Sequence, residues 1–581
     1  MSGRWVFAPR RAPVRAGCGV ERASPARVES AARVERGTPA RVEHAPRVAR
    51  ARPARTGGRA AARVLRLAAT LGLALLAACS RAPDRPNVLL ITVDTLRADR
   101  SSLATGSARV TTPRLDALAG EGVLCTHAST PRAKTTPALA SLMTGLAPHA
   151  HGVRDLMAPL ALEHATLAER LHAAGWRTAA IVGNYVLQAR FSGLERGFEQ
   201  WTEDLPDAHG VPPEDVPQRT ARSMTDGALA ALGLGPATDA KAGPNAPFVR
   251  AGDPWFLWLH YMDPHGTYAP PEAHSVFRSA APAPIDRTER THVAEYNVPA
   301  EARLPDGRVD AARVTDLYDG EVRYVDAEIG RLLDALRARG DLANTLVIVT
   351  ADHGESLGEH DDWFEHGRDA CEGCVRVPLI VRFPDDAPEE RRRARARCDA
   401  DVSLTDLAPT LLDWLGLPPL PVANGGTAPR DARAFAAGRS VLPALLGRAD
   451  ARTHPVFGER VDRAELGGAV QHKTVRIGRW KLVQRWAAPP PDRGGKPTLL
   501  SEALYDVERD PREERDLAVV AASAEPGAAA DAPLGELRAL LLAFTAADAR
   551  FAELADDLAR ERARLEAVDP EALRILKGLG Y

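Results

Sequence analysis

The residues with the clearest chemical use are an Asp352-His353-Gly354-Glu355 run and the His366-Gly367 pair that follows it. An apolar, β-branched stretch at residues 346–349 precedes the run and is typical of a fully buried strand. In open α/β sheets, ligands bind beyond the carboxyl ends of the strands. Adjacent Asp and neutral His side chains are suitable ligands for a divalent metal such as Zn or Mn. The same run can also be a polar loop after a core strand, so its interpretation depends on other parts of the chain.

Two further predicted strands end in acidic or imidazole side chains. One apolar run ends at Asp94, and residues 255–261 are followed by Asp263 and His265. Because the carboxyl ends of parallel strands meet at one edge of a sheet, these side chains are expected to lie near the Asp352-His353 pair.

A hydroxyl-rich segment, Lys134-Thr135-Thr136-Pro137, leads into a predicted helix at residues 137–143. A threonine at a helix N-terminus can cap the helix, and the same position favours a bound anion. A metal that contacts the hydroxyl oxygen lowers its pKa and makes it a nucleophile. The sequence therefore predicts one divalent-metal site that combines Asp94, Asp352, His353 and Thr135.

The elements that must position these residues alternate between strands and helices. Strands are predicted at 86–94, 178–182, 255–261, 346–350 and 377–382, and helices at 112–120, 137–143, 167–174, 316–337 and 406–415. This alternation favours an α/β fold with a mostly parallel sheet that is covered on both faces.

The C-terminal part has a different pattern. Residues 473–477 and 480–484 are typical of short strands, with little helix nearby, which predicts a small antiparallel subdomain. Residues 535–566 carry a helical pattern. The predicted organisation is an 80–420 catalytic α/β domain, a 421–517 C-terminal α+β subdomain, and a 518–581 flexible segment with a helical tail.

The chain has 581 residues, of which 45% are hydrophobic, so it can form a large core and more than one folding unit. Its net charge of -2 is unevenly distributed. Residues 1–78 hold 16 Arg and 4 acidic residues, whereas the remainder holds 59 basic and 73 acidic residues. The part of the chain after residue 78 is therefore acidic, which argues against a general nucleic-acid binder.

The N-terminal part does not resemble a folded domain. Residues 1–62 are rich in Arg, Ala and Pro and are predicted to be disordered, with the true translation start nearer residue 60. Residues 63–79 combine a basic flank, a short apolar run and the ending Leu76-Ala77-Ala78-Cys79, which is typical of a secretory signal. The apolar run is too short for a comfortable membrane span.

The Leu76–Cys79 ending resembles a bacterial lipoprotein signal. That resemblance implies cleavage before Cys79 and lipidation of its thiol. The alternatives are a plain signal peptide or a buried helix. The expected location is the bacterial cell envelope, lipid-anchored and facing the periplasm or the exterior.

Several motifs, in order along residues 85–581, resemble the sulfatases of the alkaline phosphatase superfamily. The motifs are Asn87–Arg97, Thr135–Gly145, Asp352–Glu355 and His366-Gly367. The resemblance implies a doubly wound α/β core and a metal-assisted, in-line attack on a sulfate or phosphate ester through a covalent intermediate. It places Asp94, Asp352 and His353 at metal ligands and Thr135 at the nucleophile.

The chain departs from the sulfatase pattern at the nucleophile. Sulfatases carry a Cys, or occasionally a Ser, at the position of Thr135 and oxidise it to formylglycine, which a threonine cannot form. Thr95 stands where a second Asp is usual, and His353 stands where Asn is usual. These changes move the site toward phosphodiesterase and phosphotransferase branches, so phosphodiester or phosphonate ester hydrolysis, without formylglycine, is favoured over aryl sulfate hydrolysis.

The ion count and three catalytic roles stay open. Asp263, His265 and His366 could hold a second ion, or the two imidazoles could bind the anion or protonate the leaving group beside a single metal. One ion is favoured over two, and Zn or Mn is favoured with Ca as an alternative. Lys134 is expected either to neutralise an ester oxygen or to be a solvated charge.

Two other functions compete with hydrolysis. One is transfer of a phosphoryl-linked group to an envelope glycan or lipid, and the other is a non-catalytic, metal-stabilised scaffold lipoprotein. The expected partners are an anionic ester substrate and, through Cys79, a membrane, with no nucleic acid.

Overall fold

The computed structural model describes residues 85–103, 109–205, 218–235, 247–250, 252–393, 396–421, 435–448, 454–462, 470–488, 497–518, 532–548 and 563. The predicted N-terminal segment and signal, Cys79 included, lie outside the described residues. Residues 82–581 form one compact unit, to which all the elements below belong. In the described ranges, no helix combines the length and apolar character needed to cross a bilayer.

The main sheet has eight strands in the order β11-β2-β10-β7-β1-β5-β3-β4. Strand β10 runs antiparallel to both of its neighbours, and every other pairing is parallel. This confirms the predicted mostly parallel sheet. The strands are β1 Asn87–Val93, β2 Val123–Ser129, β3 Arg177–Val182, β4 Gln200–Thr202, β5 Trp255–Tyr261, β7 Thr345–Ala351, β10 Arg376–Arg382 and β11 Ala396–Ser403.

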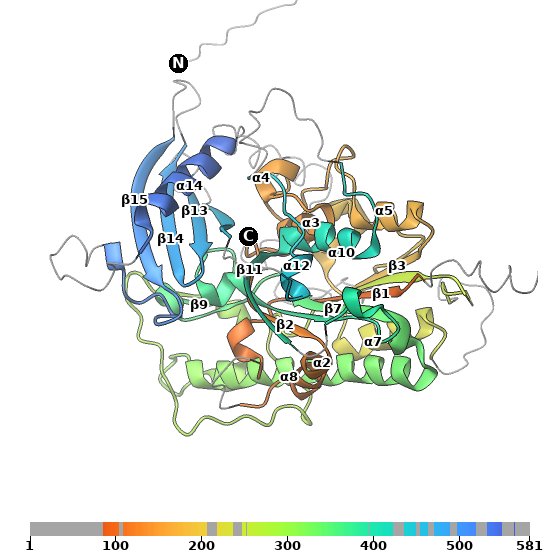
Figure 1. Ribbon diagram of the computed structural model, residues 1–581. Helices are drawn as coiled ribbons and strands as arrows, with labels where there is room; N and C mark the ends of the chain where they lie inside the picture. Colours follow the sequence, from red (N-terminus) through yellow and green to blue (C-terminus); the bar gives the residue numbers. More distant parts are fainter. Residues whose placement is uncertain are drawn as a thin grey trace, which may run out of the picture. The chain divides into compact units, whose positions relative to one another are not determined.

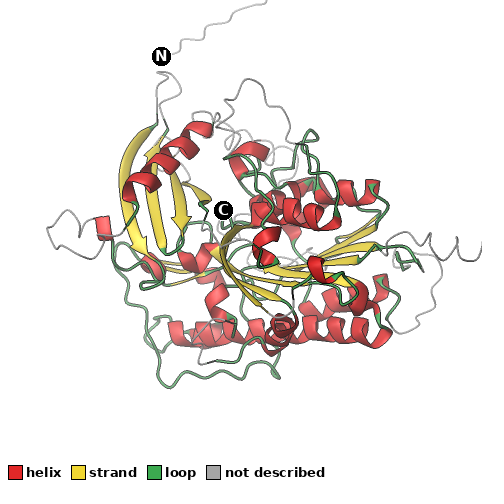
Figure 2. Ribbon diagram, viewed as in Figure 1, coloured by secondary structure: helices red, strands yellow, loops and turns green. Residues whose placement is uncertain are grey.

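Helices cover both faces of this sheet (Figures 1 and 2). Helices α2 and α8 lie below it in the view of Figure 1, with α7 packed on α8, whereas α3, α5 and α10 lie above it. This is the doubly wound arrangement. The helices are α2 Pro113–Glu121, α3 Thr135–Thr144, α4 Pro148–His151, α5 Leu167–Ala173, α6 Ala189–Ser192, α7 Ala221–Ala231, α8 Ala311–Arg339, α9 Glu372–Val375, α10 Leu407–Leu415 and α12 Leu442–Leu445.

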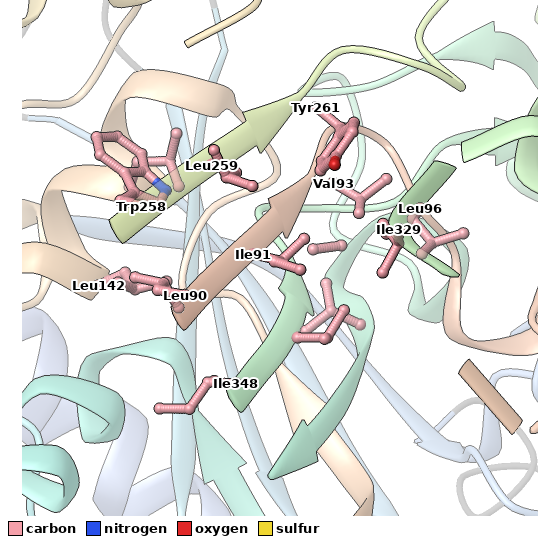
Figure 3. Close-up of a cluster of buried hydrophobic side chains, with 14 of the residues drawn as sticks. Leu90, Ile91, Val93, Leu96, Leu142, Trp258, Leu259, Tyr261, Ile329 and Ile348 are labelled. Atoms are coloured by element: carbon pink, nitrogen blue, oxygen red, sulfur yellow. The ribbon is translucent and has the colours of Figure 1, made fainter. Parts of the chain in front are cut away.

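The core lies on either side of β1, whose seven residues are all buried. Successive side chains of a strand point to opposite faces. Figure 3 shows the result: Leu90 lies beside Leu142 of α3, whereas Val93 lies on the side of Ile329 of α8. Strand β1 therefore anchors both helical layers and holds the position from which Asp94 emerges.

The register of the central strands sets the position of the site. Val93 of β1 pairs with Tyr261 of β5 and with Ala351 of β7. The three strands therefore end at one level, and the residues that follow β1 and β7 emerge side by side at the same edge.

A second sheet, β12-β13-β14-β15, is antiparallel throughout and is covered by α14. It has its own hydrophobic cluster, which includes Val475, Leu482, Leu504, Leu537 and Phe544. This sheet confirms the predicted antiparallel character of the C-terminal part, while the predicted domain boundaries stay predictions. The elements are β12 Val456–Asp462, β13 Val470–Ile477, β14 Trp480–Ala487, β15 Thr498–Asp506 and α14 Leu534–Ala547; a small third sheet holds β6 His292–Val293, β8 Ser356–Leu357 and β9 Asp362–Glu365.

Candidate metal centre and nucleophile

Three buried groups converge at the carboxyl ends of the central strands. Asp94 follows β1, Asp352 follows β7, and His260 is the penultimate residue of β5. One ligand atom from each lies within 4.8 Å of the others, and all three side chains are fully buried. Nitrogen and carboxylate donors at this spacing can share one divalent cation.

The two carboxylates fit a cation because neither is fully satisfied without one. Asp94 Oδ1 and Asp352 Oδ2 are buried and have no hydrogen-bond partner in the described chain. Burial and the neighbouring charge of Asp94 raise the pKa of Asp352 well above its usual value. For Asp94, burial acts in the same direction, but the hydrogen bond to His260 and the charges of His265 and His353 outweigh it and lower the pKa. Two such carboxylates share a proton or bind a positive ion.

His353 presents a bare nitrogen to this centre. Its Nδ1 lies 2.9 Å from the carbonyl oxygen of Gly354, which can only accept, so Nδ1 carries the proton and Nε2 carries a lone pair. Nε2 lies 3.3 Å from Asp352 Oδ2 and 3.7 Å from Asp94 Oδ1. Burial and the charge of His366 lower the pKa of His353 to about 3, which keeps the imidazole neutral. A neutral imidazole held by its second nitrogen is the usual form of a metal ligand.

Thr135 completes the predicted set. It is the first residue of α3, because the backbone of Lys134 before it is still extended. The helix ends at Gly145, which adopts a left-handed conformation. The hydroxyl Oγ1 lies 3.4 Å from His353 Nε2. The structure therefore brings together Asp94, Asp352, His353 and Thr135, as the sequence predicts.

His265 and His366 lie beside this centre. The ring of His366 lies 4.5 Å from that of His353, and the ring of His265 lies 5.2 Å from that of His366, centroid to centroid. The Nδ1 of His265 donates to the carbonyl oxygen of Gly266 at 3.0 Å, which leaves its Nε2 able to accept. Burial, with the charge of His265, lowers the pKa of His366 to about 4. The three imidazoles form a row that can contact an anion or a second cation.

Lys134 is buried next to Thr135 and is not a solvated charge. Its side chain is 7% exposed, and its Nζ pairs with Asp155 Oδ1 at 2.6 Å. Gly367 explains how the lysine fits: a Cβ on that glycine would lie only 2.8 Å from Lys134 Cε. The His366-Gly367 motif thus provides an imidazole and leaves space for the side chain of Lys134.

Asp263 does not join the carboxylates of the metal centre in the described chain. Its Oδ2 accepts the amide of Ala221 at the start of α7, and its carboxyl group is hydrogen-bonded to Glu321. Burial raises the pKa of Asp263 to about 6. The structure thus gives this residue a role at the N-terminus of α7 and places only His265 and His366 of the predicted second-ion set at the site.

Two contacts were missed by the sequence analysis. His260 Nε2 lies 3.4 Å from Asp94 Oδ2, and its Nδ1 lies 2.9 Å from Thr92 Oγ1. Asn184, just beyond β3, donates from Nδ2 to Asp94 Oδ2 at 2.7 Å. The sequence does contain an indication for His260, because it is a histidine inside an otherwise apolar strand. A buried imidazole at such a position needs polar partners.

The doubly wound α/β fold and a buried centre able to hold a divalent cation define a class of metal-dependent α/β proteins. Comparison with known proteins agrees with this class: the sequence model of the sulfatase family matches residues 86–417. The chain belongs to the sulfatase family. Metal dependence is a property of that family, and the centre at Asp94, His260 and Asp352 offers a place for an ion.

Individual relatives and solved structures span sulfur and phosphorus chemistry. The chain is 29% identical over 430 residues to the multifunctional alkaline phosphatase superfamily protein PehA of Trinickia caryophylli, which covers 62% of this chain and 77% of that protein. It is 26% identical over 366 residues to an arylsulfatase of Clostridium perfringens, which covers 57% of this chain and 75% of that protein. The phosphonate monoester hydrolase of Agrobacterium radiobacter has a similar fold, with a TM-score of 0.55, 23% identity, and 80% of this chain and 96% of that chain covered.

Proposed function

We propose that this hydrolase is a divalent-metal-dependent enzyme that uses Thr135 as its nucleophile and cleaves phosphodiesters or phosphonate esters in preference to aryl sulfates. The observation that carries the proposal is the position of the Thr135 hydroxyl. It lies 3.4 Å from His353 Nε2, in a centre where two buried carboxylate oxygens have no partner in the described chain.

The residue type supports phosphorus chemistry. A threonine cannot be oxidised to the formylglycine aldehyde, so the sulfatase route through an aldehyde hydrate is closed to this chain. A hydroxyl beside a metal remains able to attack an ester directly. Phosphorus chemistry also occurs among proteins similar to this chain, because a phosphonate monoester hydrolase has a similar fold.

Asp94, Asp352 and His353 would hold the cation, with His260 beside Asp94. Once bound, a cation supplies positive charge that lowers the pKa of the Thr135 hydroxyl and stabilises the developing charge on the ester. Thr135 Oγ1 then forms a bond to phosphorus while the bond from phosphorus to the leaving oxygen breaks, and the proton of the hydroxyl passes to the departing oxygen. In the second stage water attacks phosphorus, and Thr135 leaves with a proton. Lys134 and the His265–His366 pair lie where they can contact the anionic oxygens.

Turnover on matched aryl esters tests this proposal. The purified protein is stripped of metal, reloaded with Zn, Mn or Ca, and assayed on a 4-nitrophenyl phosphodiester, phosphonate monoester, phosphate monoester and sulfate. We expect metal-dependent turnover of the diester or the phosphonate, lost in Thr135→Ala and retained in Thr136→Ala, its neighbour in α3. Sulfate turnover alone would contradict the proposal. Bound metal without any turnover would also contradict it and would leave group transfer or a scaffold role.

We also propose that the protein is lipid-anchored at the bacterial envelope through Cys79, which lies outside the described residues. The support is the Leu76-Ala77-Ala78-Cys79 ending of a signal-like segment. Replacing Cys79 with Ser should move the protein from the membrane fraction to the soluble fraction. Recovery of both forms in the soluble fraction would contradict the anchor.

A further inference from the structure

Arg132 lies three residues before Thr135, in the loop between β2 and α3. Its side chain is only 3% exposed. Its Nε and Nη1 groups are buried and have no hydrogen-bond partner in the part of the chain that the structure describes. A guanidinium stays charged at all physiological pH values, so this is a buried cation with unsatisfied donors.

The acidic groups nearest to Arg132 are engaged by other cations. Asp155 accepts from Lys134 Nζ at 2.6 Å and also from the amide of Leu156. Glu459 pairs with Lys473 Nζ at 2.8 Å. Burial lowers the pKa of Arg132, and the partial attraction of these two carboxylates does not reverse that effect.

Such an arrangement costs stability. Buried N–H groups are nearly always hydrogen-bonded, and a buried charge without a partner is destabilising. A bound ligand that completes the hydrogen bonds is one physical reason to keep such a group. An anion would satisfy both the charge and the free donors, because a guanidinium binds carboxylate, phosphate and sulfate groups through paired hydrogen bonds.

The neighbours of Arg132 connect it to the reaction site. The charge of Lys134 acts on His366, one of the three imidazoles beside Thr135. Lys134 is in turn bonded to Asp155, whose carboxylate is the strongest attractive charge on Arg132. Asp155 therefore bonds Lys134 and attracts the charge of Arg132, and both cations lie in the loop that leads directly into Thr135.

We infer that Arg132 binds a second anionic group of the substrate, next to the scissile ester, and so selects esters that carry an additional carboxylate, phosphate or sulfate. This inference rests on the function proposed above, because it assigns the substrate class of the same site. Arg132 is the specificity residue, and Lys134 lies between it and the nucleophile.

Ligand binding tests the inference without turnover. The probes are methylphosphonate and phosphonoacetate, which share a phosphonate and differ by one carboxylate, titrated calorimetrically into the metal-loaded full chain. We expect phosphonoacetate to bind about ten- to a hundredfold more tightly, as one charged hydrogen-bonded pair provides. Arg132→Gln should abolish that preference and keep the affinity for methylphosphonate, and Arg132→Lys should retain part of it.

A buried arginine far from the site gives the matched control. Arg382 in β10 is 4% exposed and is paired with Asp385. Arg382→Gln should keep the preference for phosphonoacetate. The inference is overturned if Arg132→Gln keeps the preference, or if it weakens both probes equally.

Kinetics separates this inference from the proposed function. Methyl 4-nitrophenyl phosphate and carboxymethyl 4-nitrophenyl phosphate release the same phenolate and differ by one carboxylate. The carboxylate should lower KM about tenfold with little change in kcat, and Arg132→Gln should equalise the two KM values. Binding preference without turnover would contradict the proposed function alone, whereas turnover without preference would contradict the inference alone.

Stability distinguishes a ligand-binding arginine from a structural one. Arg132→Met removes an unsatisfied buried charge, so its midpoint of urea unfolding without ligand should equal or exceed that of the wild type. Arg382→Met, which breaks a satisfied pair, should lower the midpoint. A clear loss of stability in Arg132→Met would assign the guanidinium a structural partner and overturn the inference.

Discussion

Two groups of buried charges in this protein differ in whether each charge has a partner of opposite sign within the chain. The metal centre at Asp94 and Asp352 places two carboxylates together and leaves an oxygen of each without a partner in the described chain. The second group joins the antiparallel sheet to α9, the short helix before β10. There, Lys481 lies between Glu372 and Glu513, at 3.2 and 2.8 Å, and Arg476 pairs with Glu372 at 2.7 Å.

The difference shows what each group does. In the second group every named carboxylate faces a cation, so the charges are neutralised within the chain and hold two parts of the fold together. In the metal centre the two carboxylates repel one another until a cation is bound. Relief of this repulsion contributes to the free energy of metal binding. Charge balance inside the chain thus separates a structural group from a functional one.

Removing a carboxylate from the metal centre should give the largest effect. Asp352→Asn should abolish metal binding and reduce kcat by on the order of 10⁴-fold. Its metal-free stability should be unchanged or higher, because like-charge repulsion is removed. Metal content and urea unfolding measure both results.

Asp263→Asn is the matched control for Asp352→Asn, because Asp263 also follows a central strand but bonds Ala221 and Glu321. It should keep the full metal content. Loss of an ion in Asp263→Asn would contradict the role assigned to this residue at the start of α7.

Breaking the balanced group should affect stability and not chemistry. Lys481→Met leaves the buried Glu513 without its cation and leaves Glu372 with Arg476 alone, which should lower the free energy of unfolding by about 3–5 kcal/mol. The kcat/KM of the folded fraction should stay near the wild-type value. A large loss of kcat/KM with unchanged stability would reverse the comparison.

The balanced group also predicts the response to acid. Burial raises the pKa of Glu372, but the charges of Arg476 and Lys481 outweigh it and lower the pKa to about 2. A depressed carboxyl pKa contributes stability that is fully present above the unfolded value of about 4.3 and is lost as the pH falls toward 2. Urea midpoints between pH 6 and pH 3 should therefore decline, and Glu372→Gln should flatten the decline. An unchanged slope in Glu372→Gln would contradict this assignment.

His260 should give the smallest effect of this series. It contacts Asp94 from β5, so His260→Gln should weaken metal binding about 10- to 100-fold, as loss of a group that orients a ligand does. Metal titration measures the change. His151→Gln is the control, because His151 is equally buried and bonds Ser141 in α3. Unchanged metal affinity in His260→Gln would exclude this histidine from the centre.

The sequence predicted the parts of the site that follow a strand or begin a helix. Asp94, Asp352 and Thr135 stand at such boundaries, where hydrophobic periodicity stops and polar residues appear. His260 lies inside β5, whose sequence is otherwise apolar, so its contact with Asp94 depends on the register between β5 and β1. Register is a property of the assembled sheet and is not visible in one segment.

The misassigned parts of the fold have similar physical causes. Strands β2 and β11, which pair with each other, were not predicted because each mixes buried with partly exposed residues and carries several polar side chains. The reversed direction of β10 leaves no trace in its own apolar sequence. The bond from Asp263 to the start of α7 was not predicted, because that helix was not predicted.

The most direct test of the account is to find the covalent intermediate. Metal-loaded protein is mixed with a phosphodiester, quenched in acid within a turnover, digested and analysed by mass spectrometry. A phosphoryl adduct on Thr135 is expected, and both the adduct and turnover should be absent in Thr135→Ala. Turnover that persists in Thr135→Ala, or an adduct on another residue, would contradict it.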